Sequence, residues 1–120
     1  MNTSTDDRRN DRRNDRDAHD YLPADLAAQL PPLYATESQG DDAVAYVKLF
    51  TPDSSWTWYL TEYDPHEGLC FGLVIGDETE LGYVSLDELR AARGPMGLRI
   101  ERDLWFTPTS LSDIRSGTVR

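Results

Sequence analysis

The sequence is poor in the residues that build redox, metal and membrane-spanning sites. Its one cysteine, Cys70, excludes an internal disulfide and a cysteine-based zinc site. The two histidines, His19 and His66, do not have the close spacing that zinc ligands usually show. No apolar run approaches the roughly 20 residues that cross a bilayer, and the N-terminus lacks the apolar segment of a secretory signal. These absences favour a protein of the reducing cytoplasm.

Positive charge is also scarce over most of the chain. Twenty-two Asp and Glu residues face twelve Lys and Arg residues, which gives a net charge of −10. Residues 21–89 contain thirteen acids and a single base, Lys48, while the arginines from Arg90 onward lie in the last quarter. Because nucleic-acid binding depends on Lys and Arg that displace counterions, such a field repels phosphate backbones. We therefore expect no direct nucleic-acid binding and an attraction to basic proteins.

The first twenty residues differ in composition from the rest. They contain six Asp and five Arg, partly in a four-residue repeat, and almost nothing apolar except Met1 and Ala18. A segment that cannot bury apolar surface does not fold alone, which predicts a disordered tail over residues 1–20. A tail that becomes ordered on a partner is the alternative. Residues 21–120 have the size of one domain.

Hydrophobic periodicity and turn residues predict an α+β fold. The expected sheet is an antiparallel meander of four to five strands, accompanied by two to three short helices. Helices are expected from Pro23, from a capping box that begins at Ser85, and from Ser110. Extended segments are expected over residues 44–50, 55–63, 69–75, 81–84 and 98–106.

Two tryptophans and the cysteine lie on predicted strands. Trp56 and Trp58 share one strand face, which is either part of the core or an open surface for a protein partner. A base-stacking platform is disfavoured there, since such platforms lie in positive grooves. Cys70 lies in the most apolar strand, between Leu69 and Phe71, and we interpret it as a buried, inert thiol.

Carboxylates at strand ends raise the possibility of a metal-dependent nuclease. Glu62 and Asp64 are two residues apart, and Asp53 precedes them in a turn, so these three are candidate ligands for Mg²⁺ or Mn²⁺. However, the lysine expected two residues after the second acid of such a motif is replaced by Asp64. We therefore favour the interpretation that these three carboxylates are ordinary solvated side chains of turns and strand ends. We therefore predict no catalytic residue, no metal and no cofactor, with the nuclease as the alternative.

Several strings of the sequence are distinctive. They are Leu-Pro-Pro-Leu-Tyr at 30–34, Phe-Thr-Pro-Asp-Ser-Ser-Trp-Thr-Trp-Tyr at 50–59, Thr-Glu-Tyr-Asp at 61–64, Phe-Gly-Leu-Val at 71–74, Glu-Leu-Gly-Tyr at 80–83 and Ile-Glu-Arg-Asp-Leu at 100–104. Over about residues 22–115 the chain resembles the bacterial family known as domain of unknown function 2958. Members of that family are often carried by plasmids, phages and integrated elements. The resemblance implies no catalytic residues, although some members are labelled single-stranded DNA endonucleases.

The leading hypothesis is therefore a small non-enzymatic interaction protein. Its acidic surface would occupy the basic, nucleic-acid-binding site of another protein, as a nucleic-acid mimic that inhibits a host defence or DNA-binding protein. Acidity that serves only solubility is the alternative explanation of the charge. The candidate contact residues are the acids of the turns and strand ends, namely Asp41, Asp42, Glu62, Asp64, Glu67, Asp77, Glu78 and Glu80.

Overall fold

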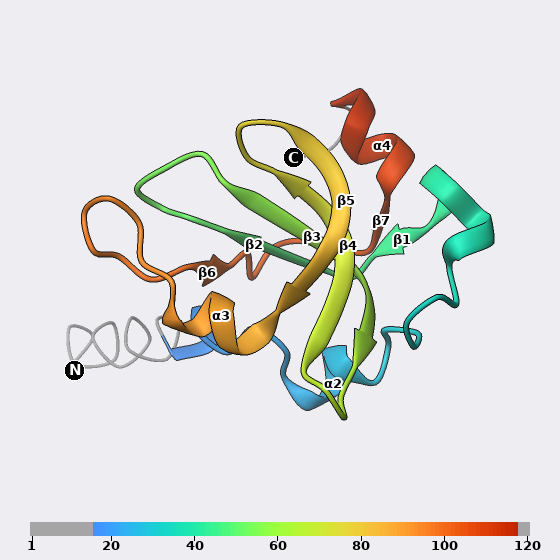
Figure 1. Ribbon diagram of the computed structural model, residues 1–120, viewed down its shortest axis with the longest axis horizontal. Coiled ribbons are helices and arrows are strands. Elements are labelled where there is room, and N and C mark those ends of the chain that lie inside the picture. Colours follow the sequence, from blue (N-terminus) through green and yellow to red (C-terminus); the bar gives the residue numbers. More distant parts are fainter. Residues whose placement is uncertain (1–15, 118–120) are drawn as a thin grey trace, which may run out of the picture.

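A five-stranded antiparallel sheet in the order β5-β4-β3-β2-β6 forms the centre of the computed structural model, which describes residues 16–117 (Figure 1). The predicted α+β fold and antiparallel meander are confirmed. The strands are β2 (Val47–Phe50), β3 (Thr57–Asp64), β4 (Leu69–Ile75), β5 (Thr79–Ser85) and β6 (Glu101–Arg102). Tight turns join β2 to β3, β3 to β4 and β4 to β5, so consecutive strands pair with one another.

The segment predicted as one strand over residues 44–50 serves two sheets. Its first half, β1 (Val44–Ala45), pairs with β7 (Thr109–Ser110), whereas its second half is β2. Tyr46 lies at the change, where its N–H donates to the carbonyl of Leu60 over 3.0 Å. The predicted extended segment at 98–106 contains only the two residues of β6, because the chain then leaves the sheet in a loop.

Short helices flank the sheet, and two of them begin at predicted caps. They are α2 (Ala24–Ala27), the 3-10 helix η1 (Glu37–Asp42), α3 (Leu86–Ala91) and α4 (Leu111–Ser116). The Ser85 hydroxyl accepts from the Glu88 N–H over 3.3 Å, and the Ser110 hydroxyl accepts from the Asp113 N–H over 3.1 Å. Each cap satisfies a backbone donor that a helix start leaves free. The helix predicted from Pro23 is confirmed and has only 4 residues.

Each face of the sheet carries its own hydrophobic cluster. On one face, α3 packs with Leu49, Leu60 and Trp58, and full burial of a leucine contributes about 1.5–3 kcal/mol. On the other face, α4 packs with Tyr59, Leu73 and neighbouring residues. Trp58 is 9% exposed and belongs to the core, whereas Trp56 is 40% exposed and covers Gly76 at the end of the sheet. The two tryptophans therefore do not form an open platform.

The N-terminal residues that the structure describes are part of the folded body. The Arg102 guanidinium donates to the carbonyls of Asp20 over 2.7 Å and Asp17 over 3.1 Å, and Ala18 is buried. The body thus includes residues that the sequence pattern assigned to the tail. The prediction of disorder for residues 1–15 lies outside the described residues. Over residues 16–117 no helix has the length and apolar character needed to cross a membrane.

Candidate functional site

The eight candidate acids lie in three separate parts of the fold. Asp77, Glu78 and Glu80 form the exposed tip of the β4–β5 hairpin and the start of β5. At the opposite end of the sheet, Asp64 and Glu67 lie at the β3–β4 turn. The third group is Asp41 and Asp42 at the end of η1, with Glu62 beneath the neighbouring loop.

One of these locations is partly neutralised. Asp41 accepts from the Arg115 guanidinium over 3.2 Å, whereas the neighbour of Glu67, at 3.8 Å, is the exposed ring of His66. By contrast, Asp77, Glu78 and Glu80 form no ion pair with any cation of residues 16–117. The hairpin therefore presents the least compensated negative charge among the predicted contacts.

The Glu62 side chain is buried and hydrogen-bonded within the fold, not exposed on its surface. Its carboxylate is 2% exposed and accepts from the Tyr34 N–H over 2.8 Å, the Thr36 N–H over 2.9 Å and the Thr36 hydroxyl. These bonds fasten residues 34–36 to β3 and satisfy buried donors. Because its oxygens are enclosed by the loop, Glu62 does not contribute to the exposed acidic surface.

Tyr34 is the residue that this carboxylate holds in an uncommon backbone conformation. Its φ of 74° lies in the left-handed region, which costs a non-glycine residue about 1–2 kcal/mol. The phenol ring is 63% exposed and meets Tyr83 of β5 edge to face, with 6.4 Å between ring centroids. Strain of this kind is common at binding sites, where the surrounding structure determines an otherwise unfavourable geometry.

A groove opens between this loop and strand β5. Tyr34, Phe71, Leu81 and Tyr83 form its apolar wall, Glu37 lies at its rim, and its volume is about 130 Å³. Phe71 and Tyr83 are cross-strand partners with ring centroids 4.9 Å apart. The pKa of Tyr83 lies above its ordinary value because partial burial disfavours the phenolate, an effect increased by the Tyr34 hydroxyl and by the carboxylates of Glu62 and Glu37. Tyr83 therefore stays neutral and offers an aromatic surface rather than a base.

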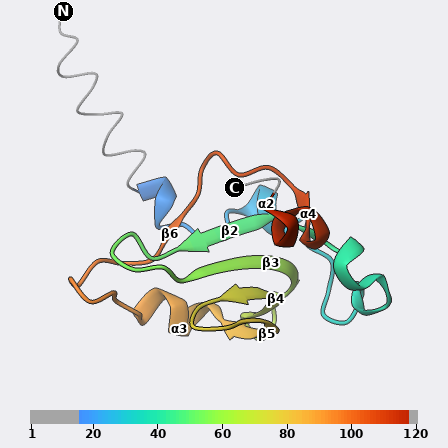
Figure 2. The ribbon, with the colours of Figure 1, turned by 90° about the horizontal axis from the view of Figure 1, so that it is seen from above.

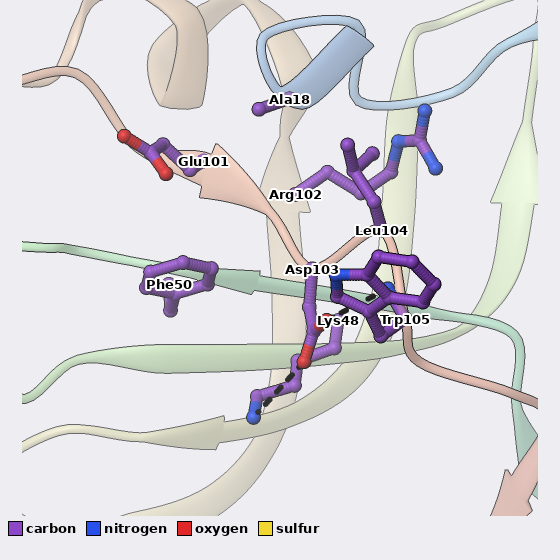
Figure 3. A pocket seen from close by; sticks show the side chains of 8 residues that line it. All are labelled: Ala18, Lys48, Phe50, Glu101, Arg102, Asp103, Leu104 and Trp105. Carbon is purple, nitrogen blue, oxygen red and sulfur yellow. Dashed lines mark hydrogen bonds and ion pairs between the residues drawn. The ribbon is translucent and has the colours of Figure 1, made fainter. Parts of the chain in front are cut away.

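A second, wider hollow of about 480 Å³ lies on the other side of the sheet's centre, beside β2 and β6 (Figure 3). Within it the Lys48 ammonium and the Asp103 carboxylate point toward each other at 3.5 Å, and Arg102 is bound to backbone carbonyls. Trp105, 92% exposed, stands at its edge. Its cations are already paired within the chain, so this hollow offers neither a free basic site nor a nucleophile with a base.

The three candidate metal ligands of the nuclease alternative are not brought together. Asp53 precedes β3 and Asp64 ends it, which separates them by roughly 20 Å at about 3.3 Å per residue. Asp53 instead accepts from the N–H groups of Met96 over 2.8 Å and Leu98 over 3.4 Å. Among residues 16–117 no three His, Cys, Asp or Glu side chains are grouped as metal ligands. The geometry therefore gives the nuclease no support.

The interpretation of Cys70 is confirmed. The side chain is fully buried within the core on the α3 side of the sheet, and burial raises the pKa of its thiol to about 12. No sequence pattern indicates the groove at β5, because Tyr34 and Tyr83 are 49 positions apart.

A family model described as "Protein of unknown function (DUF2958)" matches residues 19–114. The match spans most of the chain, so the chain belongs to this family, as the resemblance of its motifs indicated. Neither the curated proteins nor the solved structures contain a match to the chain.

Proposed function

We propose that the chain, as a member of this family, is a non-enzymatic interaction protein. Its partner is a basic protein, and its most important contact is the acidic hairpin formed by Asp77, Glu78 and Glu80. These three residues are exposed at the β4–β5 connection and at the start of β5, where the paired strands hold their backbones close together. Fixed charges of one sign steer an oppositely charged partner and speed its association.

The observation that carries this proposal is the uneven use of cations within the fold. Lys48 pairs with Asp103, Arg90 with Asp87, and Arg115 with Asp41. Arg93 and Arg102 donate to backbone carbonyls. None of these cations pairs with the hairpin, so its carboxylates remain available to an external partner.

The same proposal extends to what the partner does. A basic surface that accepts closely spaced carboxylates resembles one that accepts phosphates, so the partner is expected to be a nucleic-acid-binding protein whose site this chain occupies. For a family associated with mobile elements, the expected target is a host defence or DNA-binding protein. The lone, buried Cys70 is compatible with a reducing cytoplasm as the place of encounter.

The test uses the full chain as bait in a bacterial lysate, with D77K/E78K/E80K as the variant. The matched control is D25K/E88K/D113K, which makes the same change of net charge at three scattered exposed positions outside the predicted contacts. Each exposed charge pair contributes about 0.2–1 kcal/mol, and reversal adds repulsion, so the hairpin variant should bind about 10- to 100-fold more weakly. The scattered variant should retain most of the affinity and the same dependence on salt.

Equal losses in the two variants would show that only net charge matters, and the hairpin would not be the contact. A captured partner should also release a labelled oligonucleotide when this chain is added. If the partner binds the oligonucleotide and this chain simultaneously, the nucleic-acid mimicry is wrong.

A further inference from the structure

Strand β5 leaves a long edge of the sheet unpaired. It has seven residues, and no strand among residues 16–117 pairs with its outer side (Figure 2). Proteins usually protect such edges with proline, lysine, a bulge or a covering segment, since an open edge binds further strands. The residues Thr-Glu-Leu-Gly-Tyr-Val-Ser at 79–85 include neither proline nor lysine, and their pairing with β4 is regular.

The register identifies which backbone groups point outward from β5. Leu86 N–H donates to the Gly68 carbonyl, and Gly76 N–H donates to the Glu78 carbonyl. In an antiparallel ladder, hydrogen-bonded pairs alternate with non-bonded pairs, so Glu80, Gly82 and Val84 are the β5 residues that bond to β4. The N–H and C=O groups of Thr79, Leu81 and Tyr83 consequently face away from the sheet.

The side chains along this edge separate into an apolar face and an acidic face. Leu81 is 43% exposed and Tyr83 is 49% exposed, and both lie on the side of the groove that Tyr34 closes. Glu80 alternates to the opposite side, which it shares with its cross-strand partner Val74 and with Gly82 and Val84 of its own strand. An added strand would therefore meet apolar side chains on one face and the Glu80 carboxylate on the other.

The groove exists before any partner binds. Tyr34 keeps its left-handed backbone because the buried Glu62 carboxylate accepts from its N–H, and its ring is already positioned against Tyr83. A preformed wall reduces the ordering cost that binding must overcome. This independent feature identifies the side of β5 on which an apolar side chain of the partner would be received.

Charge complementarity identifies the occupant. A second copy of this chain also carries a net charge of −10, and this repulsion disfavours its approach to the acidic edge. We propose that β5 accepts an extended segment of the basic partner as a sixth strand. Basic side chains of that segment face Glu80, and the alternate apolar side chains pack on Leu81 and Tyr83. This inference rests on the proposed function, because it describes how the same partner is held.

The test titrates the ¹⁵N-labelled full chain with the synthetic peptide Thr-Lys-Val-Lys-Val-Lys-Thr and follows amide hydrogen exchange by NMR. The amides of Leu81 and Tyr83 should exchange freely in the unbound protein and become protected by the peptide. The control peptide Thr-Glu-Val-Glu-Val-Glu-Thr should protect neither. Two further peptides carry N-methyl groups either on the lysines or on the valines. Because only alternate amides of an added strand face β5, one methylated peptide should bind and the other should not.

Matched variants test the two faces separately. Glu80→Lys should lower the affinity for the lysine peptide on the order of fivefold, since a like charge then faces the added strand. Asp25→Lys makes the same charge change on the exposed surface of α2, outside the predicted contacts, and should leave affinity unchanged. Tyr83→Ala should weaken binding, whereas Met96→Ala, at a side chain that is 80% exposed elsewhere, should not.

Several outcomes would overturn strand addition. Peptide-induced shifts confined to Asp77 and Glu78, without protection of Leu81 and Tyr83, would leave the acidic contact of the proposed function intact and refute the sixth strand. Equal behaviour of the two methylated peptides would also refute it. Protection of the two amides without peptide would mean that another occupant already holds the edge. That occupant is a second copy if protection depends on protein concentration, and a segment of the same chain if it does not.

Discussion

Replacement of Glu62 by glutamine tests the structural role assigned to this carboxylate. The two acceptor oxygens receive three donors, of which the Thr36 N–H and hydroxyl share one oxygen. In Glu62→Gln, the remaining carbonyl can serve the Tyr34 N–H, and the new amide can donate to the Thr36 hydroxyl. The buried Thr36 N–H then loses its acceptor and faces another donor.

An unsatisfied buried donor costs about 1–3 kcal/mol, and the lost charge weakens the remaining bonds, so we expect a loss of about 2–3 kcal/mol in the free energy of unfolding. With a urea m-value of about 1.5 kcal/mol/M, the unfolding midpoint should fall by about 1.3–2 M. Glu62→Ala should cost more, about 3–5 kcal/mol, because no acceptor remains. The assay is urea unfolding followed by circular dichroism.

Glu67→Gln is the matched control, since that carboxylate is exposed and surface changes usually stay within about 0.5 kcal/mol. If the free energy of unfolding of Glu62→Gln lies within about 0.5 kcal/mol of that of the parent, the carboxylate does not hold the Tyr34 loop. The preformed groove would then lose its physical basis.

Three further predictions follow from packing and burial. A Cβ at Gly72 would overlap the carbonyl oxygen of Tyr59, so Gly72→Ala should lower the free energy of unfolding by at least about 3 kcal/mol. Its cross-strand partner Gly82 has open space, so Gly82→Ala should raise the free energy of unfolding by about 0.5 kcal/mol. Thermal unfolding compares the two variants, and equal stabilities would contradict the close approach of Gly72 to Tyr59. Because burial raises the pKa of the Cys70 thiol to about 12, iodoacetamide at pH 8 should label it only after unfolding, and rapid labelling of the native protein in mass spectra would refute its burial. Burial also raises the pKa of Tyr21 and Tyr59, whereas in the unfolded chain tyrosines ionise near pH 10 and the thiol at about 8.5. The free energy of unfolding should therefore fall as pH rises from about 9 through the higher pKa values of the folded state. Constant stability from about pH 8 to 11 would contradict this.

Features with local causes could be predicted from the sequence. Ser85 and Ser110 predict helix starts, because the capping oxygen and the backbone N–H that it accepts from are only three residues apart. The apolar run at 69–75 coincides with β4, since both faces of that strand are covered. The order from β2 to β5 followed from short turns, whereas the pairing of β6 with β2, which leaves β5 at an edge, did not.

Features that depend on distant partners could not be predicted. The alternation along β3 suggested that Glu62 and Asp64 share one solvated face, but the register shifts by a bulge between Leu60 and Glu62. This turns the Glu62 carboxylate toward the backbone of Tyr34 and Thr36, which come from a loop more than 25 residues earlier. No residue of that loop predicts the positive φ of Tyr34.

The hydrogen bonds that Arg102 donates to the carbonyls of Asp17 and Asp20 have a practical consequence for experiments. It anchors the start of the described chain beside β6, and β6 and β5 border opposite sides of the sheet. A surface linkage attached at Arg16, where the described residues begin, would therefore depart from the side remote from β5. Sensor chips and affinity resins loaded in that way should display strand β5 toward the solution, ready to meet an incoming ligand.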